Sequence, residues 1–281
     1  MEQKDIRFRK QRDLGVVISD SFDFLRQEAK PLLRMIVIYV LPFIILYAGA
    51  QIYFQRNVLS QFDLSNTPES LMADIGPFYL NLFMFMFFGL FVQSLLAGTY
   101  YSYLEAYIKH GKGNFQLTDI SSKFFSNSLL ALGANLIFVI IVFFGAMMCL
   151  IPGLYFANTF SLVLFISVFE KKGISDALNR SWKLVNSSWW NTLLINLIAI
   201  IMVYAISIVL SIPSMVMGVS STVFSTEITN PVDYPDWYWV LNAISSVVVT
   251  VLLVIPFTFQ AFQYFNLAEL NDPTITLPPE E

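Results

Sequence analysis

The chain has 281 residues, of which 56% are apolar and 13% are charged, and its formal net charge is −4. Soluble domains carry about 25% charged residues, so this composition favours a chain solvated by lipid, where each ionised group costs several kcal/mol. The balance of charge gives no sign of nucleic-acid binding, one cysteine precludes an intramolecular disulfide, and one histidine argues against a His-based metal site or catalytic triad.

Six segments are long and apolar enough to cross a membrane as helices, because a crossing needs about 20 largely apolar residues. In chain order they cover about 32–54, 78–104, 128–149, 153–169, 190–212 and 237–265. The third and fourth lie in a charge-free stretch, 129–169, and are joined by the turn signal Ile151-Pro152-Gly153. We expect two full crossings there; the alternative is a hairpin that enters the membrane and returns on the same side.

The basic residues lie on one side of these spans. Fifteen of the 16 Lys and Arg residues fall in the N-terminal segment and in the loops after the second and fourth spans. The opposite side holds one cation and six acids, namely Arg56, Asp63, Glu69, Asp74, Glu227, Asp233 and Asp236. Because cytoplasmic loops carry the excess of Lys and Arg, we expect both termini in the cytoplasm.

A short amphipathic stretch precedes each odd-numbered span. In residues 13–30 the apolar side chains recur every three or four positions, and residues 174–190 repeat this pattern at an offset of 160. Residues 118–127 hold a weaker copy. The pattern predicts three helices that lie flat at the cytoplasmic surface, although loops between apolar spans tend to be amphipathic in any case.

The predicted fold is therefore an all-α membrane protein with six transmembrane helices and three amphipathic interfacial helices on the cytoplasmic side. One polytopic domain, 1–270, is expected, and residues 271–281 are expected to form a disordered acidic tail. Each flat helix with its two spans makes one unit, which suggests a three-fold repeat about the membrane normal. The units are 13–108, 117–171 and 174–267.

The polar residues inside the spans are amides and hydroxyls. The candidate polar membrane residues are Gln93, Asn135, Asn158, Asn196 and Asn242. Either they line a route for a substrate, or they join helices through hydrogen bonds worth about 0.6–2 kcal/mol each; we favour the second interpretation. The lack of ionisable residues in the membrane interior argues against an ion-coupled transporter.

A glutamate closes each unit at the inner boundary, at Glu105, Glu170 and Glu269. A carboxylate at a helix C-terminus is disfavoured by the helix dipole, so we expect Glu105 and Glu170 to form ion pairs with nearby cations. Candidate partners of Glu170 are Arg180 and Arg26. The alternative is a solvated helix end.

One stretch of the sequence resembles a known bacterial family. It includes Ile151-Pro152-Gly153-Leu154-Tyr155, residues 170–173, 177–184 and Trp189-Trp190, and the closing segment 263–267 before Glu269. This pattern is similar to the six-span membrane domain found beside some glycerophosphoryl diester phosphodiesterases, and to its stand-alone relatives. The resemblance implies a membrane fold in a bacterial inner membrane, and it carries over no catalytic residue.

The sequence holds no recognisable phosphate-binding glycine loop, no paired carboxylates in a cleft and no nucleophile beside a base. We therefore expect no enzyme and no catalytic, cofactor-binding or metal-binding residue. The first functional hypothesis is an accessory or scaffold subunit, with membrane lipids and other membrane proteins as partners and no nucleic acid. The alternative is a lipid or small-solute transporter, which predicts a continuous polar groove joining Asn135, Asn158 and Asn196.

Overall fold

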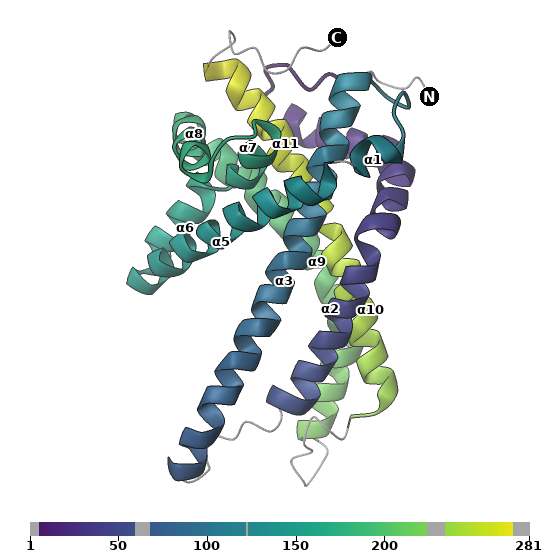
Figure 1. Cartoon of the computed structure of the whole chain (residues 1–281), viewed down its shortest axis with the longest axis vertical. Helices are drawn as coiled ribbons and strands as arrows, with labels where there is room; N and C mark the ends of the chain where they lie inside the picture. Colours follow the sequence, from purple (N-terminus) through teal and green to yellow (C-terminus); the bar gives the residue numbers. More distant parts are fainter. Residues whose placement is uncertain (1–5, 60–67, 122, 224–233, 272–281) are drawn as a thin grey trace. The chain divides into compact units, whose positions relative to one another are not determined.

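The computed structural model describes residues 6–59, 68–121, 123–223 and 234–271 (Figure 1). Helices make up 88% of these residues, and the described part contains no strand. Among these residues, five helical segments are long and apolar enough to cross a membrane, where helices that continue across a short break are counted as one. The number is six if the bent pair α1–α2 is one span. The chain is thus an all-α, multi-pass membrane protein.

The helices follow one another with short connections. They are α1 (Leu14–Tyr39), α2 (Leu41–Tyr53), the π-helix η1 (Phe54–Leu59), α3 (Pro68–His110), α4 (Leu117–Ser121), α5 (Phe124–Met148), α6 (Leu150–Thr159), α7 (Val163–Phe169), α8 (Ile174–Ser187), α9 (Trp189–Val223), α10 (Asp236–Leu252) and α11 (Val254–Asn271). At 1.5 Å per residue α3 is roughly 65 Å long, about twice the thickness of a hydrocarbon core. Only part of α3 therefore lies in the apolar layer of a bilayer.

The chain folds into two compact units. The first holds Met1–Val40, Ser94–Met202 and Leu253–Glu281, and the second holds Leu41–Gln93 and Val203–Leu252. This division reflects packing in space. The three-fold sequence repeat and the single polytopic domain that we expect from the sequence stay predictions.

Two helix breaks lie just before prolines. We expected the first span to begin at about residue 32, but α1 continues through Pro31 and ends at Tyr39. The break falls at Val40, two residues before Pro42, and a similar break at Leu253 precedes Pro256. A proline cannot donate to the carbonyl four residues earlier, and its ring crowds that carbonyl. The two breaks follow from this loss.

The α5–α6 connection is tighter than the sequence suggests. The chain turns at the extended residue Cys149, and the expected turn residues 151–153 lie in the first turns of α6. A Cβ atom on Gly153 would lie 2.8 Å from the Cα of Ala146, so only glycine permits this approach of the two helices.

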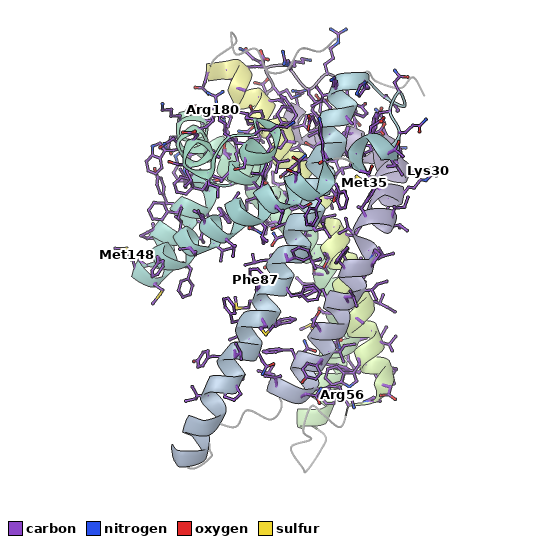
Figure 2. All side chains as sticks on the ribbon, in the orientation of Figure 1. Lys30, Met35, Arg56, Phe87, Met148 and Arg180 are labelled. Carbon is purple, nitrogen blue, oxygen red and sulfur yellow. The ribbon has the colours of Figure 1, made fainter. Side chains whose placement is uncertain are left out.

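The turn at Cys149 is suited to a lipid environment. The Cys149 N–H donates to the Gly145 carbonyl at 3.2 Å, and the Cys149 carbonyl accepts from the Gly153 N–H at 3.3 Å. The flanking side chains are apolar and exposed, including Met148 at the tip of α5 (Figure 2). Because both bonds lie within the hairpin, neither backbone polar group of Cys149 depends on water.

The core of the first unit is aromatic. All seven residues of α7 are buried. Phe165 in this helix contacts Tyr101 edge-on at 5.0 Å between ring centroids and Tyr264 at 4.7 Å. Phe8, which precedes α1, stacks on Phe262 at 4.8 Å. These contacts join segments from both ends and the middle of the chain into one core.

The second unit is held by smaller aromatic stacks and leaves much of its surface apolar. The ring of Phe85 stacks on Tyr47 at 5.3 Å and on Phe54 at 4.8 Å. Large apolar side chains of α2 and α3, such as Leu46 and Met84, are more than 60% exposed. A continuous apolar surface of this kind is suited to contact with lipid.

Gly98 is the position at which a single methyl group is expected to disturb the first unit most. A Cβ atom there would lie 2.5 Å from the Cα of Ser128, so Gly98→Ala must push α3 and α5 apart. We expect a loss of about 1–3 kcal/mol, measured as a lower melting temperature in detergent. Gly49→Ala is the matched control, because nothing lies within 4 Å of that site and alanine favours helix by up to about 1 kcal/mol. Equal melting temperatures for both variants would contradict the close contact.

Candidate functional site

The structure brings two of the candidate polar membrane residues together. Asn158, on α6, accepts a hydrogen bond at its Oδ1 from Asn196 Nδ2 at 3.0 Å. Its own Nδ2 donates to the Trp189 carbonyl at 3.1 Å. The two amides therefore join α6 to the start of α9, and Trp189 adds a third polar contact by donating to Thr159 Oγ1 at 3.2 Å.

The other candidates have separate contacts. Asn135 Nδ2 donates to Ser94 Oγ at 3.2 Å, which joins α5 to α3. Asn242 donates to the Tyr238 carbonyl in its own helix at 2.9 Å. Gln93 is half-buried on α3. The described hydrogen bonds thus give Asn135 and the Asn158–Asn196 pair different partners, and they do not link the three amides to one another.

Glu170 is surrounded by groups that stabilise its charge. Its Oε1 accepts a hydrogen bond from the Tyr264 hydroxyl at 2.5 Å. Arg180 Nε lies 3.5 Å from the same oxygen, and Lys172 Nζ lies 2.5 Å from Oε2. The side chain is 7% exposed. The buried carboxylate therefore links the end of α7 to α8, where Figure 2 labels Arg180, and to α11.

Glu105 has two cationic neighbours. Its Oε1 lies 2.9 Å from Lys123 Nζ and 3.5 Å from Lys171 Nζ. These contacts connect the last turns of α3 with the segments that precede α5 and follow α7. Arg26, the other partner proposed for Glu170, is exposed on α1 and does not take part in the described pairs of Glu170.

Sequence reasoning missed a buried ion pair between Arg12 and Asp20. Arg12 Nε lies 2.8 Å from Asp20 Oδ2, and the two side chains are 1% and 8% exposed. The guanidinium also donates to the Phe8 carbonyl at 2.7 Å, and its central carbon lies 5.1 Å from the centre of the Phe262 ring. The Arg12 backbone N–H donates to Asn266 Oδ1 at 2.7 Å.

These contacts tie the N-terminal segment to α11, more than 250 residues later in the chain. In the sequence Arg12 is one of eight cations before residue 35. Nothing in its spacing separates a buried arginine from a solvated one, because its partners come from distant parts of the chain.

A pocket of about 700 Å³ lies in the first unit between α1 and the segment from the end of α3 to α4. Beside the pocket the chain turns at Gly111 and Gly113, which have φ of 77° and 72°, values that glycine adopts readily. The chain between them carries Lys112 back toward Glu28. Lys112 Nζ lies 3.5 Å from Glu28 Oε1, and the Tyr103 hydroxyl donates to Glu28 Oε2 at 2.6 Å.

Comparison of the chain with protein-family models, with curated proteins and with solved structures finds no match. The resemblance to the membrane domain beside glycerophosphoryl diester phosphodiesterases therefore stays a prediction from the sequence. Among the residues that the structure describes, no three His, Cys, Asp or Glu side chains gather as a metal site requires.

Arg12→Ala tests the buried ion pair. Removing one partner of such a pair leaves an uncompensated buried charge and costs about 3–5 kcal/mol, so we expect a clear fall of the melting temperature in detergent. Arg26→Ala is the matched control on an exposed position and is expected to melt like the wild type. The double variant Arg12→Ala with Asp20→Ala is expected to lose less stability than the sum of the losses in the two single variants. Strict additivity would show that the pair contributes nothing as a pair.

Proposed function

We propose that the protein is a non-enzymatic accessory or scaffold subunit for other membrane proteins in a bacterial inner membrane, with both termini in the cytoplasm. The observation that carries this proposal is that four of the five candidate amides of the spans are taken up by hydrogen bonds within the fold, namely Asn135, Asn158, Asn196 and Asn242. Their role as structural links leaves the exposed helix faces for association. The one-sided distribution of Lys and Arg and the family resemblance support the location.

One such face runs along α9. Leu197, Ile201, Tyr204 and Ile208 recur at spacings of three or four residues, and each is at least 45% exposed. Residues at these spacings share one side of a helix. Within a membrane, an apolar helix face of this kind is in contact with lipid or with a helix of another protein.

Transport of a lipid or a small solute ranks second. It predicts a polar groove that joins Asn135, Asn158 and Asn196, and the hydrogen bonds of Asn135 and of the Asn158–Asn196 pair involve different partners. Pairwise links of this type are the usual role of amides between membrane helices, which favours the accessory role.

Gentle affinity purification from the native membrane, followed by mass spectrometry of the eluted proteins, tests the accessory role. We expect a membrane protein in stoichiometric amount. Ile201→Trp with Ile208→Trp adds bulk to the exposed face of α9 and is expected to lower the yield of that partner several-fold. Phe143→Trp, at an exposed position of α5, is the control and is expected to leave the yield unchanged. Recovery of the chain without any stoichiometric protein would contradict the proposal.

The orientation has its own test, with Cys149 first replaced by alanine so that no other thiol is present. Asn57→Cys and Lys183→Cys each introduce one thiol at an exposed position on opposite predicted sides. We expect a membrane-impermeant maleimide to label position 57 when the outer face of the inner membrane is accessible, and position 183 only after the membrane is opened. Labelling of position 183 in sealed membranes would reverse the proposed topology.

A further inference from the structure

The pocket between α1 and α4 is lined by three cations, two of which take part in no described ion pair. Lys30 and Arg34 line it from α1, one turn apart on the same helix face, and both are exposed. Figure 2 marks Lys30 on this helix. Lys112 lines the pocket from the other side. Of these three, the described ion pairs include only Lys112, through its contact with Glu28.

The one carboxylate among the described lining residues does not cancel this positive charge. Glu28 is 2% exposed, and its two oxygens face the Tyr103 hydroxyl at 2.6 Å and Lys112 Nζ at 3.5 Å. Glu28 and Lys112 therefore balance each other, and Lys30 and Arg34 leave a net charge of +2 on the lining. A pocket with this excess favours an anion.

One part of the remaining lining is apolar, and it lies at the predicted boundary of the membrane. Pro31, Phe115 and Leu117 contribute to the wall. On α1 the residues beside Arg34 that turn away from the core are apolar, and Leu33 and Val37 are each more than 50% exposed. The cations thus lie where the exposed surface of α1 changes from polar to apolar, which is the level of lipid headgroups.

We propose that this pocket binds the phosphate group of an anionic amphiphile, with Arg34 and Lys30 as the principal ligands of the phosphate. A guanidinium donates two parallel hydrogen bonds to phosphate oxygens, and an ammonium adds a point charge beside them. The volume of about 700 Å³ lies in the range of ligand pockets, and the apolar wall receives the first part of an acyl chain. This site is independent of the proposed accessory role, which depends on the outer faces of the spans.

Native mass spectrometry of the purified full chain tests the site. The protein in a neutral detergent is titrated with phosphatidylglycerol and, separately, with phosphatidylcholine of the same acyl chains. Lys30→Gln with Arg34→Gln removes the two ligands. Arg26→Gln with Lys183→Gln removes two exposed cations outside the pocket, so this control has the same net charge as the pocket variant. Melting temperatures of both double variants establish that each is folded.

We expect phosphatidylglycerol to bind more tightly than phosphatidylcholine, and we expect the pocket variant to bind it at least about tenfold more weakly, since each cation near a headgroup contributes about 1 kcal/mol. The control variant should bind like the wild type. Thr118→Trp keeps every charge and adds an indole to the lining, so it is expected to weaken binding as well. Equal binding by the pocket and control variants, or no effect of Thr118→Trp, would overturn the proposal.

A competition with inorganic phosphate distinguishes a lipid from a free anion. If phosphatidylglycerol remains bound in the presence of millimolar phosphate, the acyl chain contributes and the ligand is an amphiphile, as proposed. If phosphate displaces the lipid completely, the pocket recognises phosphate alone, which would overturn the assignment to an amphiphile. The accessory role is tested by protein partners, so it stands or fails separately.

Discussion

The main constraint on this chain is that its spans lie in a solvent that forms no hydrogen bonds. Every backbone group in the apolar layer must find its partner inside a helix, and ionised side chains must lie at the ends of the spans. The tight turn at Cys149, with both backbone groups satisfied, and the pairing of Asn158 with Asn196 follow from the same requirement. The turn and the amide pair thus satisfy their polar groups inside the fold, and large exposed side chains of the spans are apolar.

Within the first unit, ion pairs connect the segments that lie outside the predicted spans. Three ion pairs connect different segments of this unit: Arg12–Asp20, Glu170–Arg180 and Glu105–Lys123. The hydrogen bond from Tyr264 to Glu170 joins segments that are 94 residues apart in the chain. Because breaking a buried pair is costly, the pairs Arg12–Asp20 and Glu170–Arg180 stabilise the arrangement of these segments.

The all-α membrane class was predictable, because length and hydropathy alone identify spanning helices. Helix ends were less predictable. Helix α1 continues through Pro31 and ends only at Tyr39, before Pro42. The α5–α6 turn falls at Cys149, where Gly145 and Gly153 permit a close approach of the two helices. The partners of Arg12 and the neighbours of Glu28 lie far away in the sequence. Periodicity carries no information on such pairs, so the buried network and the pocket emerged only in three dimensions.

The most direct measurement is the accessibility of spin labels to oxygen and to a water-soluble nickel complex in lipid bilayers. Labels replace Met84 and Ile140, two exposed apolar residues of α3 and α5, and Lys183 of α8, in a chain whose Cys149 is alanine. If the exposed apolar surfaces face lipid, the labels at 84 and 140 are reached by oxygen and not by nickel, and the label at 183 shows the opposite preference. Nickel access at 84 and 140 would place these surfaces in water and contradict the account.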